Sequence, residues 1–346
     1  MKKPCPYGTH RVIAPVGVLP QAADQLDNTM VCQDNEILID VHTLNIDSAS
    51  FTQLKQATDS NPEAMKKMIL EIVEKRGKMQ NPVTGSGGML LGVIKQIGKN
   101  LKRDLQLGDK IVTLVSLSLT PLKIKKIKEV HLEKDQVDIE GEAILFESGI
   151  YAKIPNDLSE HLVLSALDVA GAPAQVAKLV KPNDTVLVLG AAGKSGVLCC
   201  YQARKNAGPK GKVIALISNT RKLADLQSLN VCDEIILADA RDPMAVYNEV
   251  MRVNNQQQVD VTINVVNVPN TEMTSILATK ASGIVYFFSM ATSFTKAALG
   301  AEGIASEALM IIGNGYTPGH AELTLNLLRE SKPLYDLFVR RYQAKE

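Results

Sequence analysis

Three glycines at three-residue intervals carry the clearest chemical signal in this chain. Gly190, Gly193 and Gly196 follow the apolar run Thr185–Leu189 and precede the apolar segment Val197–Ala203. This order predicts a strand, a tight turn and a helix, whose backbone N–H groups and N-terminal partial positive charge suit a pyrophosphate. The spacing G-x-x-G-x-x-G differs from the usual G-x-G-x-x-G. We predict a dinucleotide site here, against the alternative of a glycine-rich connection without a ligand.

Polar residues that follow the later apolar runs extend this candidate site. Ligands of doubly wound sheets bind beyond the carboxyl ends of the strands, so the residues just after each run are candidates. The expected cofactor-binding residues are Gly190, Ala192, Gly193, Lys194, Ser195, Gly196, Ser218, Asn219, Thr220, Arg221, Asp239, Val266, Asn267 and Ser289. An acid after the second strand would favour NAD, but Ser218–Arg221 contains none and could accommodate the 2′-phosphate of NADP. A solvated first helical turn explains Arg221 and Lys222 equally well.

The elements that position these residues alternate in type. Apolar runs predict strands at Thr185–Leu189, Val213–Ile217, Glu234–Ala238, Val259–Val265, Gly283–Phe288 and Ala308–Ile312. Amphipathic segments predict helices at Arg221–Leu229, Pro243–Arg252, Thr271–Ala278 and His320–Glu330. This alternation is typical of an α/β, doubly wound parallel sheet with two mononucleotide-binding halves, the Rossmann arrangement.

The first 150 residues show a different pattern. Short strand-like runs such as Glu36–Val41, Gly92–Ile97 and Lys110–Leu114 are separated by turns, and one helix is expected at Pro62–Lys75. The basic run Lys123–Lys128 could bind phosphate, but lysines are more typical of a solvated edge strand. We therefore expect a mainly β domain. The expected divisions are a first domain at 1–155, a Rossmann domain at 156–316 and a C-terminal segment of open assignment at 317–346.

Composition limits the partners and the compartment. The 346 residues are 45% hydrophobic and 22% charged, with a net charge of +1, which gives no electrostatic case for nucleic acid or an anionic membrane. No apolar run approaches the roughly 18 residues of a membrane span. The N-terminus lacks the apolar core of a signal peptide. Five scattered cysteines indicate reduced thiols, and so a cytoplasmic protein.

Several segments resemble the medium-chain dehydrogenase/reductase superfamily. They are Asn81–Val115, with its glycine cluster, G-x-V strand and LGDKIV, and the KPND that precedes TVLVLGAAG. The resemblance covers most of the chain and implies a GroES-like N-terminal domain, a Rossmann domain and hydride exchange with nicotinamide in a cleft between them. The zinc-ligand positions of the superfamily hold Asn45, Ser86 and a residue near Ser165. Catalytic zinc needs three Cys, His or acidic ligands, so we expect zinc-independent chemistry and no metal.

Four segments taken together resemble a narrower family, the L-erythro-3,5-diaminohexanoate dehydrogenases of lysine fermentation. They are PYGTHRV near the N-terminus, NIDSASFTQL at Asn45–Leu54, GSGGMLLG at Gly85–Gly92, and FFSMATSFTKAALGAEG through IIGNGY at Phe287–Tyr316. The resemblance implies oxidative deamination of the C3 amine to 5-amino-3-oxohexanoate and ammonia. It implies NAD as the cofactor, while Ser218–Arg221 leaves NADP open. It also implies a small-molecule diamino acid substrate, a homodimer and neither nucleic acid nor membrane as partner.

Such a deamination needs a base for the C3 ammonium, and later for the water that attacks the iminium. Asp47 is the first candidate, because it follows Ile37–Val41 on a loop that faces the nicotinamide in this family; a turn or capping Asp fits equally well. Ser48 and Ser50 could hold the water or the amine, or serve as turn residues. Glu302 is a weaker candidate, as a negative partner for a cationic substrate.

Other assignments remain open. The substrate carboxylate needs Arg, Lys or backbone N–H donors, and Arg11, Lys55 and Lys296 all lie in or near the matched segments. A zinc-free, NADPH-dependent quinone or enone reductase would also fit the superfamily, although the polar loop Asn45–Ser50 suits a hydrophobic quinone poorly. A non-catalytic dinucleotide-binding protein is the third possibility.

Overall fold

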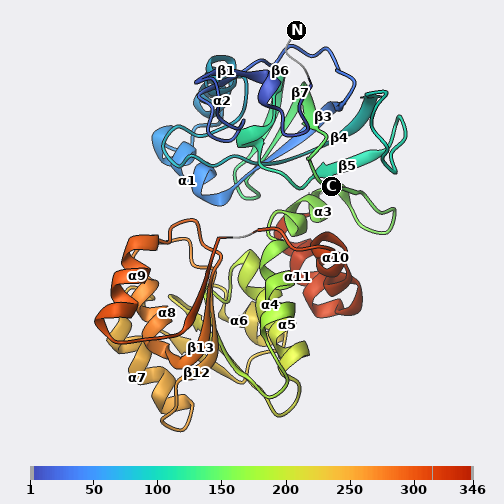
Figure 1. Ribbon diagram of the computed structural model, residues 1–346. Helices are drawn as coiled ribbons and strands as arrows, with labels where there is room; N and C mark the ends of the chain where they lie inside the picture. Colours follow the sequence, from blue (N-terminus) through green and yellow to red (C-terminus); the bar gives the residue numbers. More distant parts are fainter. Residues whose placement is uncertain (1–3, 314, 344–346) are drawn as a thin grey trace. The chain divides into compact units, whose positions relative to one another are not determined.

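The computed structural model describes residues 4–313 and 315–343, which divide into two compact units (Figure 1). Unit 1 contains Met1–Asp168 with Arg341–Glu346, and unit 2 contains Val169–Arg340. The domain limits expected from the sequence, after residues 155 and 316, stay predictions. Among the described residues no single helix is long and apolar enough to cross a membrane. The bent pair Glu160–Leu167 and Gly171–Leu179 meets that test by length and composition only.

Unit 2 is built on a parallel sheet whose described strands follow the order β11-β10-β9-β12-β13-β14. The strands are β9 (Thr185–Leu189), β10 (Lys212–Ile217), β11 (Glu234–Leu237), β12 (Val259–Asn264), β13 (Thr279–Phe287) and β14 (Leu309–Ile312). Every neighbouring pair is parallel. The chain starts in the middle of the sheet, moves to one edge, and returns to fill the other half. The doubly wound α/β prediction is therefore confirmed.

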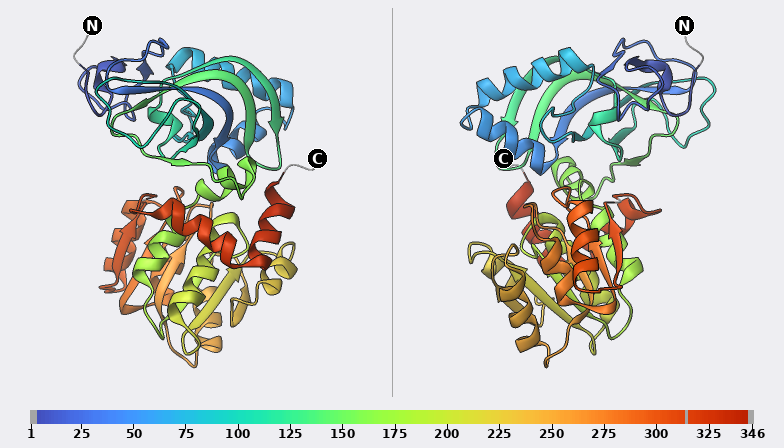
Figure 2. Two further views of the ribbon diagram at one scale, coloured as in Figure 1. Left: turned by 90° about the vertical axis from the view of Figure 1, so that its right-hand side faces the viewer. Right: turned by 60° about the vertical axis from the view of Figure 1, so that its left-hand side comes forward.

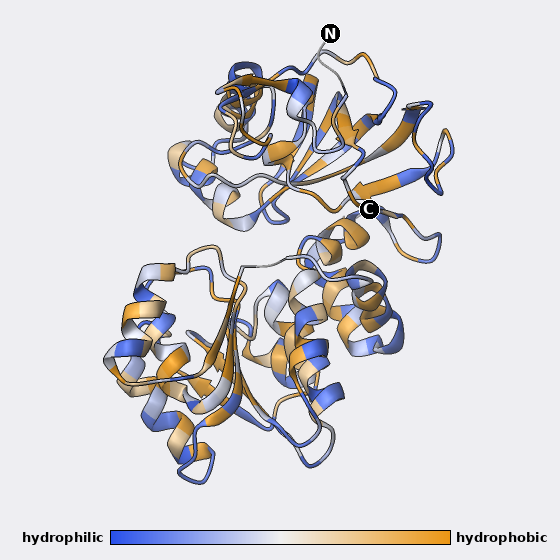
Figure 3. Cartoon of the chain, in the orientation of Figure 1, coloured by the Kyte–Doolittle hydropathy of each residue, from blue (hydrophilic) through white to orange (hydrophobic). Residues whose placement is uncertain are grey.

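Helices cover both faces of this sheet. They are α4 (Gly171–Leu179), α5 (Lys194–Ala207), α6 (Leu223–Ser228), α7 (Pro243–Val253), α8 (Glu272–Ala278), α9 (Phe294–Gly303), α10 (His320–Glu330) and α11 (Lys332–Tyr342). Helices α4, α5 and α10 pack together on one side, and α7, α8 and α9 on the other (Figure 1). Figure 3 shows apolar strands in the middle of unit 2 and polar residues toward the outside of the helices.

The sequence analysis missed α4, α9 and α11. The first four residues of helix α4, GAPAQVAKL, are all buried, and α9, FTKAALGAEG, is made mainly of small residues. Neither carries the regular alternation of apolar and polar faces that an exposed helix shows. Strand β13 also begins earlier than expected, at Thr279, because Thr279 pairs with Val259 before a register shift in β12.

Unit 1 contains an antiparallel sheet with the order β6-β7-β3-β4-β5-β8. The strands are β3 (Glu36–Ile46), β4 (Gly88–Ile97), β5 (Lys110–Thr113), β6 (Leu122–His131), β7 (Gln136–Phe146) and β8 (Tyr151–Lys153), with a separate pair, β1 (Val12–Ala14) and β2 (Gln25–Leu26). The basic run Lys123–Lys128 lies in β6 at the edge of the sheet, as expected. The mainly β prediction for this part of the chain is confirmed.

The helices of unit 1 were only partly expected. They are α1 (Ser48–Ala57), α2 (Pro62–Arg76) and α3 (Glu160–Leu167), with short 3-10 turns at Thr9–Arg11 and Leu117–Leu119. Figure 2 shows α1 and α2 along one side of the sheet, where Phe51, Leu54, Met65 and Ile69 enter the core. The expectation of a single helix was wrong. Helix α1 buries only Phe51, Leu54 and the polar Ser50, so its sequence carries too few apolar residues for a periodic signal.

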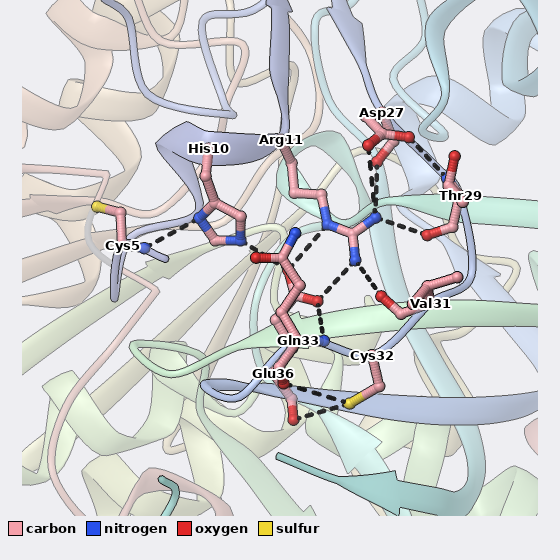
Figure 4. Close-up of polar contacts among 9 residues, drawn as sticks. All are labelled: Cys5, His10, Arg11, Asp27, Thr29, Val31, Cys32, Gln33 and Glu36. Atoms are coloured by element: carbon pink, nitrogen blue, oxygen red, sulfur yellow. Dashed lines mark hydrogen bonds and ion pairs between the residues drawn. The ribbon is translucent and has the colours of Figure 1, made fainter. Parts of the chain in front are cut away.

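A buried ion pair fastens the N-terminal segment to the start of β3 (Figure 4). Arg11 is 1% exposed and Glu36 is 0% exposed. The Arg11 Nε and Nη2 atoms donate to the two Glu36 carboxylate oxygens at 2.8 and 2.6 Å. The same guanidinium donates to the carbonyl oxygens of Thr29 and Val31 at 2.6 and 2.7 Å. All three guanidinium nitrogens of Arg11 are thus hydrogen-bonded within the protein, and the suggestion that this buried side chain binds a substrate carboxylate was wrong.

Candidate active site

The glycine turn forms a close junction between β9 and α5. Gly190 has a φ of +82°, which L side chains rarely adopt, and Gly193 is the N-cap of α5. A Cβ on Gly196 would lie 2.2 Å from the Gly190 carbonyl oxygen and 2.6 Å from the Ala191 Cα. Glycine at the N-cap position offers no side chain to the first turn of α5. This arrangement fits the pyrophosphate of a dinucleotide.

The other expected cofactor residues follow the carboxyl ends of neighbouring strands. Leu189 pairs with Leu216 and with Asn264, and Asn264 pairs with Phe287, so four strands end at one edge of the sheet. Ala192, Gly193, Lys194 and Ser195 extend from the first of these ends, and Ser218–Arg221, Val266, Asn267 and Ser289 from the others. The parallel topology thus gathers all of these residues on one edge. Their individual contacts with a cofactor stay predictions.

Arg221 and Asp239, two of the expected cofactor residues, have charged side chains with hydrogen-bond partners in the structure. The Asn219 side-chain oxygen accepts from the Arg221 backbone N–H at 3.1 Å and from its Nε at 3.4 Å. The four residues Ser218–Arg221 are exposed. Asp239 forms an ion pair with Arg241, whose Nη2 lies 2.6 Å from the Asp239 carboxylate. The exposed edge next to β10 and β11 therefore presents two guanidinium groups, of which one is paired with a carboxylate.

Asn264 is a positioning residue that the sequence analysis missed. Its side chain is fully buried; the amide nitrogen donates to Thr271 and Ser275 at 2.8 and 2.9 Å, and the oxygen accepts from the Val266 N–H at 3.1 Å. The backbone carbonyl accepts from Phe288 at 3.0 Å. Asn264 therefore shapes the turns after both β12 and β13. The available signal was a polar residue at the end of the apolar run VDVTIN.

Asp47 lies at the end of β3 and caps α1. Its carboxylate accepts from the Ser50 backbone N–H at 3.1 Å, and its own N–H donates to Gly87. Burial raises the pKa of Asp47 and the negative charge of Asp168 adds to this effect, although hydrogen bonds from Ser86 and Ser50 act in the opposite direction. The expected loop position was therefore wrong, since Asp47 joins a strand directly to a helix. A carboxylate whose pKa is raised accepts a proton more readily than an exposed aspartate does.

Three hydroxyl groups form a triangle next to Asp47. The Ser50 Oγ lies 2.6 Å from both the Thr84 Oγ1 and the Ser86 Oγ, and the last two are 3.0 Å apart. Asn81 holds the turn that carries Thr84 and Ser86, because its side-chain oxygen accepts from the N–H groups of Val83 and Thr84. Thr84 was not among the expected site residues. Only the fold brings it to Ser50, since nothing in the local sequence links α1 to this turn.

The other two catalytic candidates lie elsewhere. The Ser48 hydroxyl donates to the Asp135 carboxylate at 2.9 Å and takes no part in the triangle. Glu302 lies near the end of α9 in unit 2 and is exposed. Of the three candidates in unit 1, the structure thus places Asp47 and Ser50 in one hydrogen-bonded group. The roles of Ser48 and Glu302 stay predictions.

Gln136 links two of the positions at which relatives of the superfamily carry zinc ligands. Its Nε2 donates to the Asn45 Oδ1 at 3.3 Å and to the Ser165 Oγ at 3.1 Å, and its Oε1 lies 2.8 Å from the His161 Nδ1. The third position, Ser86, belongs to the hydroxyl triangle. Zinc prefers Cys and His ligands, and these amide and hydroxyl groups do not fit it. Burial is the main reason that the pKa of His161 is lowered.

One other group of metal-ligand type lies on the β6–β7 edge. Atoms of Glu129, His131 and Asp138 lie within 4.8 Å of one another. Both His131 ring nitrogens are already engaged, with Nε2 2.7 Å from Asp138 and Nδ1 3.6 Å from Glu129. Thr43 donates to the second Asp138 oxygen at 2.8 Å. Hydrogen bonds and ion pairs account for this cluster without a metal.

Gly196→Ala is expected to weaken NAD or NADP binding by at least about tenfold. The new methyl group would collide with the backbone of Gly190 and Ala191, so the first turn of α5 would have to move away from the pyrophosphate position. Titration calorimetry of both cofactors measures the effect, and a thermal scan shows that the variant is folded. Gly303→Ala is the matched control, because its methyl group would meet no atom within 4 Å. Equal affinities for wild type and Gly196→Ala would contradict the assignment of this turn.

Comparison with known proteins places this geometry in a family. A sequence model described as the L-erythro-3,5-diaminohexanoate dehydrogenase N-terminal domain matches residues 10–155. A protein named L-erythro-3,5-diaminohexanoate dehydrogenase from Acetoanaerobium sticklandii is 58% identical over 342 residues, covering 98% of this chain and 99% of that protein. A protein of the same name from Fusobacterium nucleatum is 59% identical over 344 residues, covering 99% and 100%.

Solved structures show the same fold at low sequence identity. The CurK enoyl reductase aligns with a TM-score of 0.58 and 17% identity over 94% of this chain and 87% of its own. A mycobacterial protein solved in complex with NADPH aligns with a TM-score of 0.57 and 15% identity over 91% and 83%. At this level of identity the likeness shows the fold, so the two-part α/β fold expected from the sequence is confirmed.

Proposed function

Because the chain belongs to the L-erythro-3,5-diaminohexanoate dehydrogenase family, we propose that the Asp47 cluster is the site at which it deaminates this substrate. The protein is an oxidoreductase that acts on a CH–NH₂ group and uses a nicotinamide dinucleotide. The products expected from the chemistry are 5-amino-3-oxohexanoate, ammonia and the reduced cofactor. The observation that carries the proposed site is a mostly buried carboxyl group with a raised pKa beside three hydroxyls.

The glycine turn and the N-terminus of α5 are the residues proposed to hold the cofactor. Their fit rests on the close approach at Gly196 and on a glycine, which has no side chain, at the N-cap of α5. When bound, the nicotinamide ring supplies the acceptor for the hydride from C3. Asn264 maintains the neighbouring turns through its buried hydrogen bonds. Hydride transfer itself needs no acidic side chain once the C3 ammonium has lost its proton.

Asp47 is the proposed proton acceptor. In its ionised form it removes one proton from the C3 ammonium, so that the nitrogen lone pair can form the C=N bond as hydride leaves the carbon. The resulting iminium is electrophilic, and water attacks its carbon. Once Asp47 has released its first proton to solvent, it accepts a proton from the attacking water. The remaining hydroxyl proton moves to the nitrogen, and ammonia leaves as the carbonyl forms. Burial raises the pKa of this carboxyl, which makes it a better proton acceptor than an exposed aspartate.

Ser86 is proposed to orient the nitrogen and the attacking water, and Ser50 to hold the Ser86 hydroxyl in place. The Ser86 hydroxyl both donates and accepts, so it can bind an ammonium hydrogen first and a water hydrogen later. Ser50 is fully buried and its backbone N–H holds the Asp47 carboxylate, which limits the movement of both groups. A polar, acceptor-rich cluster of this kind suits an ammonium group better than a hydrophobic quinone.

Absorbance of the reduced nicotinamide tests the function directly. Purified protein with L-erythro-3,5-diaminohexanoate and NAD or NADP should release reduced cofactor and ammonia in equal amounts. Reduced cofactor without ammonia would mean oxidation of a different group. Tight cofactor binding without turnover would favour an enone or quinone reductase instead.

The choice between NAD and NADP forms a separate proposal. We expect NAD to be used, with NADP accepted through Arg221, which no carboxylate opposes in Ser218–Arg221. Arg221→Ala should lower kcat/KM with NADP by about 10- to 100-fold, because a charge-assisted hydrogen bond to the 2′-phosphate is lost, and should change the NAD value little. Steady-state kinetics with both cofactors measure this. Arg252→Ala, which affects only an exposed ion pair with Glu249, is the control. An equal loss with both cofactors would contradict the proposal.

The remaining expectations concern the setting of the enzyme. A role in lysine fermentation and a homodimer stay proposals that come from the family resemblance. A cytoplasmic location stays a proposal that comes from the scattered cysteines. The state of the cysteines supports a reducing compartment, since all five are free thiols. The expected substrate is a small diamino acid.

A further inference from the structure

The hydroxyl triangle leads from the half-buried Asp47 to an exposed side chain. Ser50 is 0% exposed, Ser86 is half-buried and Thr84 is exposed. Asp47 accepts hydrogen bonds from Ser86 and Ser50. Ser86 lies 3.0 Å from Thr84, and Ser50 lies 2.6 Å from both. A series of hydroxyl groups thus leads from Ser50 and Ser86, whose hydrogen bonds lower the pKa of Asp47, to Thr84 at the surface of unit 1.

The cluster has fewer hydroxyl protons than oxygen pairs that could share one. Three hydroxyls supply three protons, and an ionised carboxylate supplies none. The oxygen pairs within the triangle, together with those that join it to Asp47, outnumber these protons. An additional proton on Asp47 would therefore find several acceptors at close range. Such a cluster favours proton uptake at Asp47 and subsequent transfer along the hydroxyls.

The backbone keeps the exposed end of this series in place. Asn81 is fully buried; its side-chain oxygen accepts from the Val83 and Thr84 N–H groups, and its backbone N–H donates to the Ser86 carbonyl at 2.9 Å. Gly85, between Thr84 and Ser86, has a φ of +73°. This conformation brings the Thr84 and Ser86 hydroxyls to the same partner, Ser50. The geometry is thus built into the turn and does not depend on a chance side-chain rotamer.

We propose that Ser86 and Thr84 form a proton relay from Asp47 to solvent, an inference that rests on the proposed deamination. Asp47 gives its acid proton to the Ser86 Oγ while Ser86 passes its own hydroxyl proton to the Thr84 Oγ1. Thr84 in turn passes its hydroxyl proton to water or to a dissolved base. One O–H bond breaks and one forms at each hydroxyl, so both side chains end unchanged and Asp47 is again a carboxylate. Ser50 orients the two hydroxyls.

Thr84→Val tests the relay, with Thr84→Ser as the matched control. In a single turnover followed by nicotinamide absorbance and a pH indicator, wild type should release its proton together with hydride transfer. Thr84→Val should delay proton release by about tenfold or more in a weak, bulky buffer, and imidazole should restore it. Thr84→Ser should behave as wild type. Because Thr84 is exposed, the valine variant is expected to fold, and a thermal scan checks this.

If Thr84→Val released its proton at the same time as it transferred hydride, the proposed relay would be overturned. A delay that imidazole does not relieve would also overturn it, because a structural defect is not repaired by a small base. Failure of the proposed deamination gives a different result: wild type would form no reduced cofactor from the diamino acid. That result is obtained before any variant is made.

Ser86→Ala gives a second and independent readout. It removes a hydrogen bond that lowers the pKa of Asp47, while burial and the charge of Asp168, the charged group that faces Asp47, continue to raise it. The acid limb of the kcat/KM profile should therefore move to higher pH, and proton release should again lag until imidazole is added. An unchanged acid limb and unchanged proton release would overturn the role of Ser86.

Discussion

Asp47→Asn is expected to lower kcat by about 10²- to 10⁴-fold, the usual contribution of a positioned general base. Asparagine is nearly isosteric and caps helices as well as aspartate, so α1 should remain intact. The variant still accepts from the Ser50 N–H but can no longer take a proton from the C3 ammonium. Steady-state rates of reduced-cofactor formation measure the loss. The thermal midpoint should change little, which separates catalysis from capping.

The pH profile sharpens this prediction. Because the folded pKa of Asp47 is raised, the active carboxylate is lost as the pH falls through that raised value, and wild-type kcat/KM should decline there. The residual activity of Asp47→Asn should lack this acid limb. Asp59→Asn is the control, since Asp59 is exposed just after α1 and already has the positive φ that asparagine tolerates. A higher KM with unchanged kcat in Asp47→Asn would assign Asp47 to substrate binding alone.

Breaking the buried pair between Arg11 and Glu36 should have the largest effect on stability. Arg11→Met leaves Glu36 as a buried charge without its guanidinium, and such losses cost about 3–5 kcal/mol of unfolding free energy. It also leaves the carbonyls of Thr29 and Val31 without the donors that now hold the N-terminal segment (Figure 4). Urea unfolding of the full chain measures the change. The exposed pair Lys66–Glu63 is the control, where Lys66→Met should cost less than about 1 kcal/mol.

The double variant Arg11→Met/Glu36→Leu tests the explanation. Replacing both charges by apolar side chains removes the unpaired carboxylate, so much of the lost stability should return. A double variant that is as unstable as Arg11→Met would mean that packing or the backbone carbonyls, and not the buried charge, dominate. Substrate turnover should follow the folded fraction in all of these variants, since neither residue belongs to the Asp47 cluster.

The lowered pKa of Glu36 predicts how the free energy of unfolding depends on pH. Burial alone would raise its pKa, but hydrogen bonds from Arg11, His10 and the Gln33 N–H outweigh this and lower the pKa to about 2. A folded pKa below the ordinary 4.5 means that its stabilising contribution is complete above that value and is lost as the pH falls toward 2. In Glu36→Gln this part of the acid transition should be missing.

Much of the fold followed from local sequence patterns. Alternating apolar runs and amphipathic segments predicted the six parallel strands, and the glycine spacing located the turn before α5. These features could be predicted because strand and helix periodicity, and the requirement for glycine at Gly190 and Gly196, act within a few residues. The lysines of β6 indicated an edge strand for the same local reason.

Helix α1 and the position of Asp47 show where local patterns were insufficient. The segment after β3 has few apolar residues, so periodicity could not reveal a helix. The capping role of Asp47 was one of two open interpretations, and the structure shows that cap and carboxyl cluster coincide. A capping aspartate is compatible with a proposed base because one carboxylate can accept from Ser50 and still face hydroxyl groups.

The sequence by itself determined the superfamily fold, the dinucleotide turn and the candidate Asp47. Only the tertiary structure decided that Thr84 and Ser86 meet Ser50, that Gln136 joins Asn45 to Ser165, and that Arg11 is buried against Glu36. These contacts join residues that are far apart in the chain. Their side chains meet because strand order and register place them together, and no local propensity encodes that meeting. Local backbone preferences thus specify elements, whereas the chemistry at their junctions depends on how the elements pack.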